Sequence, residues 1–294
     1  MNPVLRTTRP HFLVLSPIMV GLALATAHWL GYRPDLLLIV YACIGAVAAH
    51  VSVNAFNEYL DFISGLDAQT RRTPFSGGSG ALPENPHLAN RVLELAIAAL
   101  VVSASIGLFF AWYRGPMMLV PGIAGLALVI FYTNWITRQP LLCLLAPGFG
   151  FGPVMIIGSY MVFTGEYSWP AVIVSLPAFF LVNNLLLMNQ YPDIEPDRRA
   201  GRRHLLIAFG PRVGLYVYAV FALLPYVVLG VAVWMHYLPH LGLIALLALP
   251  ASLFSTLRLA VFLAHGTPLQ PGLAANVVAS LLYPLLLATG LLLA

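Results

Sequence analysis

Charged residues are scarce in this chain of 294 residues. Aspartate, glutamate, lysine and arginine together make up 8% of the sequence, whereas 60% of the residues are hydrophobic and the mean hydropathy is +0.89. An ordinary soluble domain has about 25% charged residues. The composition therefore excludes a soluble globular enzyme, a disordered chain and a fibrous protein. It is typical of a polytopic membrane protein, whose spans form helices because each must satisfy its own backbone hydrogen bonds in lipid.

Cysteine is rare and lysine is absent. The two cysteines, Cys43 and Cys143, lie in apolar runs without a Cys/His cluster, so we expect reduced, buried thiols and no zinc site. All 14 basic residues are arginine, against 10 acidic residues, which gives a net charge of +4. Because there is no basic tail, this excess predicts cytoplasmic loops and anionic lipid headgroups as its partners, and no nucleic acid.

Nine apolar runs are long enough to be membrane spans. They cover residues 11–31, 37–60, 92–112, 116–133, 142–164, 170–190, 213–235, 241–263 and 273–293. The first run follows Arg6 and Arg9 and imitates a signal peptide, but eight more runs follow it, so we interpret it as a retained span. The sequence thus predicts an all-α polytopic membrane protein of nine transmembrane helices, with residues 1–294 as a single domain.

The arginines predict the orientation of these spans. With the N-terminus in the cytoplasm, the outside segments hold only Arg33 and Arg114. The inside segments hold the other twelve, which are Arg6, Arg9, Arg71, Arg72, Arg91, Arg138, Arg198, Arg199, Arg202, Arg203, Arg212 and Arg258. This bias has the sign that the positive-inside rule requires, so the span count and the orientation support each other.

Six of the ten acidic residues fall in two short windows, 57–67 and 189–197. Each window lies at the predicted cytoplasmic end of an even-numbered span, contains Asn-x-x-x-Asp and is followed by an arginine pair. The two motifs are offset by 132 residues (57 to 189 and 61 to 193). Such a weak internal repeat often places a site between two halves of a membrane protein.

The spacing within each motif indicates a metal site. Residues four apart share a helix face, so Asn57 points the same way as Asp61, and Asn189 the same way as Asp193. Adjacent carboxylates repel, so a cation should lie between them, and oxygen-only ligands suit Mg²⁺, which usually bridges carboxylates to phosphates. The predicted ligands are Asn57, Asp61, Asp67, Asn189, Asp193 and Asp197. The plain alternative, a solvated loop, is disfavoured because carboxylates at a membrane edge are costly.

The second motif resembles that of the UbiA superfamily of intramembrane prenyltransferases. The segment from Asp193 through Asp197 and Gly201 to Leu205 resembles the family's Asp-x-x-x-Asp-x-x-x-Gly-Lys-x-Thr-Leu ending. Arg202 stands at the position of the lysine, and His204 at that of the threonine. Members of the family carry two such motifs, on loops after the second and sixth of nine helices.

The first motif is similar to that of the MenA branch of this superfamily, as Asn57-x-x-x-Asp61-x-x-x-Gly65-x-Asp67. The stretches Tyr132-Thr133, Gly152-Pro153, Gly158-Ser159-Tyr160 and Thr164-Gly165 are similar to that branch as well. One departure is Pro147-Gly148-Phe149-Gly150, where the branch usually has Gly-Glu.

The resemblance implies a bundle of nine helices around a central cavity and a Mg²⁺-dependent transfer of a polyprenyl group. The donor would be a polyprenyl diphosphate and the acceptor aromatic, 1,4-dihydroxy-2-naphthoate in menaquinone biosynthesis. It further implies an integral protein of the bacterial inner membrane, with the N-terminus and the Asp-rich loops, about residues 57–90 and 189–212, in the cytoplasm.

Candidate roles follow for individual residues. Asp61 and Asp193 are the expected catalytic residues. The expected diphosphate-binding residues are Arg71, Arg138, Arg202, Arg203 and Tyr132, because arginine forks bind phosphate oxygens. His50 and Asn54 precede Asn57 on roughly one helix face and are candidates to line the acceptor cavity.

Two other functions fit the same pattern. The first is prenyl transfer to another acceptor, such as a 4-hydroxybenzoate-like phenol, a haem, a chlorophyllide or a glycerol phosphate. The second is ion or solute transport, because repeated halves with intramembrane acids also serve transporters. Depth discriminates between enzyme and transporter, since transporter acids lie in mid-span whereas these lie at the span ends. The sequence leaves the prenyl chain length and the oligomeric state open.

Overall fold

The computed structural model describes residues 2–67 and 77–294, and within these ranges it contains helices and no strands. Among the described residues, eight helical stretches are long and apolar enough to cross a membrane. They are Pro10–Trp29, Leu36–Ile63, Pro86–Arg114, Pro140–Thr164, Trp169–Asn189, Pro211–Trp234, His240–His265 and Gln270–Leu292. The predicted all-α membrane fold is confirmed. The count differs by one, because the run at 116–133 forms a shorter apolar helix, Pro116–Phe131.

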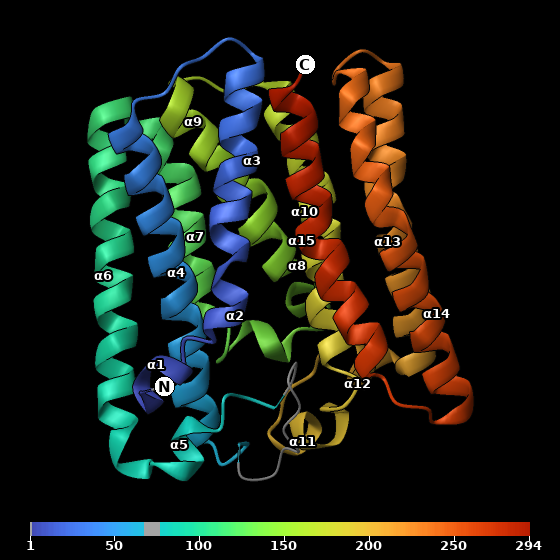
Figure 1. Ribbon diagram of the computed structural model, residues 1–294. Coiled ribbons are helices and arrows are strands. Elements are labelled where there is room, and N and C mark those ends of the chain that lie inside the picture. The colour runs from blue at the N-terminus through green and yellow to red at the C-terminus, as the bar shows by residue number, and fades with distance from the viewer. Residues whose placement is uncertain (1, 68–76) are drawn as a thin grey trace.

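The helices run roughly along one common direction (Figure 1). Their bounds are α1 Pro3–Arg6, α2 Pro10–Leu13, α3 Leu15–Trp29, α4 Leu36–Ile63, α5 Ala81–Glu84, α6 Ala89–Arg114, α7 Leu119–Phe131, α8 Pro140–Phe149, α9 Gly158–Thr164, α10 Trp169–Asn189, α11 Ile194–Arg199, α12 Leu205–Phe209, α13 Pro211–Trp234, α14 Leu249–His265 and α15 Gln270–Leu292. The segment η4, Gly150–Ile157, is a π-helix that joins α8 to α9.

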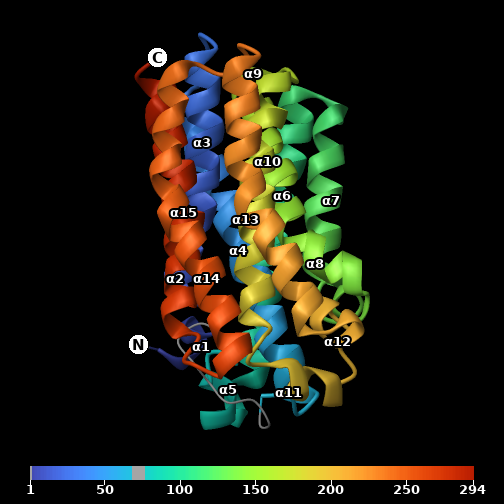
Figure 2. The same ribbon diagram turned by 90° about the vertical axis from the view of Figure 1, so that its right-hand side faces the viewer.

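Three of the short helices gather at one end of the bundle. Figures 1 and 2 place α1, α5 and α11 at the lower end with the N-terminus, while the C-terminus lies at the upper end. Both α4 and α10 run downward and finish near these short helices (Figure 1). The two acidic motifs, which follow α4 and α10, therefore lie on the same side of the bundle.

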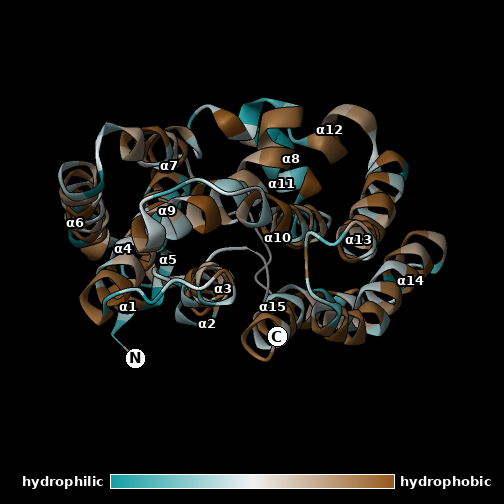
Figure 3. Cartoon of the chain, turned by 90° about the horizontal axis from the view of Figure 1, so that it is seen from above, coloured by the Kyte–Doolittle hydropathy of each residue, from teal (hydrophilic) through white to brown (hydrophobic). Residues whose placement is uncertain are grey.

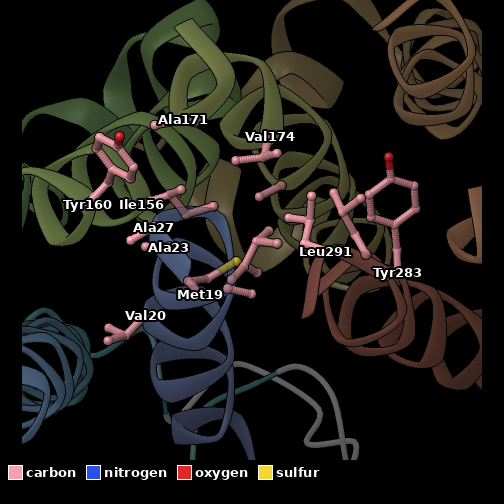
Figure 4. Close-up of a cluster of buried hydrophobic side chains, with 14 of the residues drawn as sticks. Met19, Val20, Ala23, Ala27, Ile156, Tyr160, Ala171, Val174, Tyr283 and Leu291 are labelled. Carbon is pink, nitrogen blue, oxygen red and sulfur yellow. The ribbon is translucent and has the colours of Figure 1, made fainter. Parts of the chain in front are cut away.

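The core of the bundle is built around α3. Met19, Ala23 and Ala27 of this helix are fully buried, and Figure 4 shows them facing Ile156 and Val174 of neighbouring segments. The outer faces of the long helices are hydrophobic as well (Figure 3). Trp112, Trp234 and Leu36 are 80%, 78% and 72% exposed. Exposed apolar surface of this extent is typical of contact with lipid.

Two glycines allow α8 and its continuation to pack closely on α10. A Cβ atom on Gly148 would lie 2.1 Å from the carbonyl oxygen of Phe179, and one on Gly152 would lie 2.6 Å from that of Ser175. The Gly148 amide donates a hydrogen bond of 2.6 Å to Asn183 Oδ1 on α10. The glycines thus serve helix packing, since small residues let membrane helices approach.

Replacing Gly148 with alanine is expected to destabilise the protein by about 1–3 kcal/mol, because the new methyl group would overlap the backbone of α10. Thermal unfolding in detergent measures the change. G230A is the matched control, since a Cβ atom on Gly230 of α13 meets nothing within 4 Å. Equal melting temperatures for the two variants would contradict the close packing.

Candidate active site

The end of α4 positions the first acidic motif. Asn57 and Asp61 lie one turn apart on this helix, which finishes at Ile63. Gly65 then adopts φ +76°, a left-handed conformation that favours glycine. The amides of Leu66 and Asp67 donate back to the Asp61 carbonyl, at 3.0 and 3.4 Å. This turn returns Asp67 to the side of the helix that carries the other two residues.

The second motif follows the end of α10. Asn189 is the last residue of α10, and Asp193 is the N-cap residue of the short helix α11. Asp197 lies one turn further along α11 and is buried. The chain then turns at Gly201, with φ +78°, and the Arg202 amide donates to the Asp197 carbonyl at 3.0 Å.

The two motifs meet at a cavity of about 110 Å³, here called the polar cavity. All six predicted metal ligands line it: Asn57, Asp61, Asp67, Asn189, Asp193 and Asp197. Tyr132 and Arg202 also line it, as do Gly77 and Gly78. Segments more than a hundred residues apart in the sequence thus contribute oxygen atoms to one small space.

Arg202 links the motifs directly. Its Nη2 donates to Asp61 Oδ1, and its Nη1 donates to Asp197 Oδ1 at 2.9 Å. Burial alone would lower the pKa of Arg202, but the two carboxylates outweigh it and raise that pKa. The guanidinium therefore stays charged and neutralises one acid from each motif.

Replacing Arg202 with methionine is expected to cost about 3–5 kcal/mol of stability, because two buried carboxylates would lose their shared cation. Thermal unfolding in detergent measures the loss. Added Mg²⁺ should restore part of it, since an ion that binds the folded state stabilises that state. R212M, which changes an exposed arginine, is the control. If R202M melted like R212M, the bridge would have no structural role.

Arg9 is a cavity residue that the sequence did not single out. Its Nε and Nη2 donate to Glu58 Oε1 at 3.0 and 2.7 Å, and Nη2 also donates to Asn57 Oδ1 at 3.2 Å. Glu58 accepts two further bonds from Ser79, at 2.7 and 2.6 Å. Arg9 immediately precedes Pro10 at the start of the first span, and that position at the level of the motifs is the signal that could have found it.

Three other predicted residues, all among the described ones, do not line the polar cavity. Arg138 and Arg203 are exposed and do not line the polar cavity, so their predicted contact with a diphosphate stays a prediction. The side-chain amide of Asn54 donates to the Thr8 carbonyl at 2.9 Å, and Asn54 lines neither the polar cavity nor the second, apolar cavity described below, so its predicted role at the acceptor stays a prediction. Arg71 lies outside the described residues.

Two acids of the polar cavity each have one carboxylate oxygen without a hydrogen-bond partner among the described residues. Asp67 Oδ2 and Asp193 Oδ1 are buried without a hydrogen bond from the described residues. Burial raises the pKa of Asp67 to about 7, helped by Glu58 and Asp61, and burial together with Asp197 raises the pKa of Asp193 to about 7. Within residues 2–67 and 77–294, no three His, Cys, Asp or Glu side chains form a ready-made metal cluster. The orphaned carboxylate oxygens nevertheless fit a hard divalent cation, which would satisfy them.

A second cavity of about 340 Å³, here called the apolar groove, begins one turn above the polar cavity. Three helices line both the polar cavity and the apolar groove. On each helix, the residue that lines the polar cavity lies about one turn from a residue that lines the groove. These pairs are Asn57 and Val53 on α4, Tyr132 and Leu128 at the end of α7, and Cys143 and Pro147 on α8. The groove continues to Phe110 and Met118, near the opposite end of the bundle. A charged space and an apolar one are thus arranged end to end.

His50 lies at the end of the groove that is closer to the polar cavity. Its Nδ1 is 2.9 Å from Ser16 Oγ, and its ring meets that of Phe151 edge-on at 4.8 Å. His50 therefore lines the apolar groove as a buried imidazole, and its Nδ1 already has a hydrogen-bond partner in Ser16.

Comparison with known proteins defines the class. Residues 14–268 match the UbiA prenyltransferase family, and the chain belongs to that family. It is 28% identical over 211 residues to the 1,4-dihydroxy-2-naphthoate octaprenyltransferase of Bacillus subtilis, covering 69% of this chain and 64% of that protein. The chain thus spans less than two thirds of the length of this relative.

Two further proteins are similar. The 2-carboxy-1,4-naphthoquinone phytyltransferase of Synechocystis is 23% identical over 245 residues, which cover 80% of this chain and 74% of that one. A solved structure of a UbiA homologue from Archaeoglobus fulgidus, bound to DMAPP and Mg²⁺, superposes over 99% of both chains with a TM-score of 0.66. At 14% identity this likeness shows a shared fold.

Proposed function

We propose that this chain transfers a polyprenyl group from a polyprenyl diphosphate to an aromatic acceptor, and that residues 1–294 act as one unit. The observation that carries the proposal is the end-to-end arrangement of the polar cavity and the apolar groove on α4, α7 and α8. A ligand that matches both spaces has a compact charged head and a long apolar tail. A prenyl diphosphate has this shape.

Mg²⁺ is the proposed cofactor, held by the six motif residues of the polar cavity. The orphaned oxygens of Asp67 and Asp193 support this, as does the Mg²⁺ bound in the Archaeoglobus fulgidus homologue. When bound, the ion supplies positive charge that makes diphosphate a better leaving group. Asp61 and Asp193 are the residues on which transfer depends most.

Side chains of the protein would stabilise the departing diphosphate and shield the allylic fragment. Arg202, and Arg9 beside it, supply positive charge next to the diphosphate oxygens as the C–O bond breaks. Tyr132 lies at the junction of the two spaces, where the phenol can contact the head of the donor. The apolar groove keeps water from the allylic fragment, and the ring of Phe151 offers an aromatic face to its developing positive charge.

The proposed acceptor is 1,4-dihydroxy-2-naphthoate, in menaquinone biosynthesis. Its electron-rich ring forms the new C–C bond to the prenyl group, and carbon dioxide leaves. The names of the Bacillus subtilis and Synechocystis relatives, both acting on naphthalene-ring compounds, support this choice. His50 is proposed to contact the acceptor, because it lies in the groove close to the polar cavity.

We place the protein in the bacterial inner membrane, with the N-terminus and the polar cavity on the cytoplasmic side, where a phosphorylated donor is made. The position of the acids favours an enzyme over a transporter. Asp61 lies two residues before the end of α4, and Asp193 lies beyond the end of α10. Neither acid lies in mid-span.

The test uses purified protein in detergent with labelled geranylgeranyl diphosphate, Mg²⁺ and a panel of acceptors. A prenylated naphthoquinol identified by mass is the expected product, and it should be lost with EDTA. A product formed only with another acceptor would retain prenyl transfer and overturn the naphthoate assignment. If geranylgeranyl diphosphate did not bind in the presence of Mg²⁺, the prenyltransferase proposal would fail.

A further inference from the structure

His204 is a buried residue of the polar cavity to which the proposed function assigns no role. It follows the arginine pair and is the N-cap residue of α12. Only 1% of its surface is exposed, and the residue lines the cavity together with Asp197 and Arg202.

The ring nitrogens of His204 are not satisfied by the protein. Nε2 lies 3.3 Å from Asp197 Oδ2, but neither nitrogen makes a hydrogen bond with the described residues. A neutral imidazole carries one N–H donor, and a buried donor without an acceptor is unfavourable. The polar cavity is the space from which an acceptor could approach.

The arginines of the polar cavity are already engaged. Arg202 donates to Asp61 and Asp197, and Arg9 donates to Glu58 and Asn57. His204 differs from both, because it presents a donor without a partner at the same cavity wall.

We propose that His204 donates a hydrogen bond to a phosphate oxygen of the prenyl donor, and that it thereby contributes to the affinity for the diphosphate head. This inference rests on the proposed function, since it assigns a residue to the same head-group site. A threonine hydroxyl at this position would also be a hydrogen-bond donor.

The experiment measures the binding of magnesium pyrophosphate to purified protein in detergent by calorimetry. Three proteins are compared: wild type, H204T and H204V. Threonine and valine have nearly the same shape, so the pair isolates the hydroxyl donor. We expect H204V to bind roughly ten- to a hundredfold more weakly, as for a lost hydrogen bond to a charged group, and H204T to stay close to wild type. H265V, an exposed histidine at the end of α14, controls for the loss of an imidazole.

Several results would overturn the inference. Equal losses in H204T and H204V would mean that the ring acts through packing, and wild-type affinity in H204V would mean that it does not meet the head group. If the wild type bound no pyrophosphate and no geranylgeranyl diphosphate, the proposed function would fail together with the inference.

A second measurement covers the case in which H204V does not fold. Protein labelled with ¹⁵N-histidine is titrated with magnesium pyrophosphate, and the resonances that are missing in H204T identify His204. We expect these resonances to move on binding. Unchanged resonances at saturating pyrophosphate would refute the contact.

Discussion

Replacing Asp61 with asparagine is expected to lower kcat/KM for prenyl transfer at least about a hundredfold, the scale seen when one preorganised charge-stabilising group is removed from an active site. Asparagine keeps the shape of the side chain but removes a charge that faces the polar cavity and pairs with Arg202. Product formation at saturating acceptor, with geranylgeranyl diphosphate varied, gives the value.

D35N is the matched control for this experiment. Asp35 is exposed at the other end of α4, where its carboxylate accepts the Leu37 amide at 2.7 Å as an N-cap. Asparagine is an equally good N-cap residue, so D35N should retain activity and stability. Wild-type transfer by well-folded D61N would remove the first motif from the chemistry.

Replacing Gly122 with phenylalanine should change the preference of the enzyme between long and short prenyl diphosphates. Gly122 lines the apolar groove about midway between Leu128 and Met118, and a Cβ atom there meets nothing within 4 Å. A phenyl ring would fill that space and displace the distal part of a long tail. Each methylene that loses burial costs about 0.8 kcal/mol, so we expect kcat/KM for geranylgeranyl diphosphate to fall at least about tenfold.

Dimethylallyl diphosphate should be much less affected by G122F, because its short tail ends before the obstruction. The ratio of kcat/KM for the two donors is the measurement. G230F places the same ring on an exposed glycine of α13, outside the groove, and should leave the ratio unchanged. If G122F lowered kcat/KM equally for both donors, the prenyl tail would follow a path outside this groove.

The convergence of the two acidic motifs could be predicted because it depends on local, periodic features. The span ends follow from hydropathy, and the i,i+4 spacing of Asn57 and Asp61 follows from helix geometry. The return of Asp67 depends on Gly65, because glycine readily adopts the positive φ of this turn. The repeat then places both motifs on the same side of the bundle.

Which arginines line the polar cavity could not be predicted, because their positions depend on the path of irregular segments. Arg202 and Arg203 are neighbours, yet the turn after Gly201 directs one into the polar cavity and leaves the other exposed. Arg138 lies in a short 3₁₀ turn, Ile136–Arg138, and is also exposed. Side-chain direction in such turns is set by tertiary contacts, which charge counting does not include.

The length of the helix at 116–133 was overestimated for a related reason. Hydropathy counts apolar residues, whereas the helix ends at Phe131, and Tyr132 follows in a turn that faces the polar cavity. The apolar composition of this segment serves the groove as much as the surrounding lipid, since Gly122 and Leu128 line that groove.

The length of α4 has a consequence for how substrates reach the enzyme. Its 28 residues rise about 42 Å, whereas the hydrocarbon layer of a bilayer is about 30 Å thick. The helix begins after Asp35 at the far surface, so its last turns, with Asn57 and Asp61, extend past the oily layer into the headgroup region. An amphiphile dissolved in the leaflet at this end of the bundle already has its phosphates at that height and its chain within the oily layer. It can therefore reach the protein by lateral diffusion in two dimensions, without being lifted out of the leaflet.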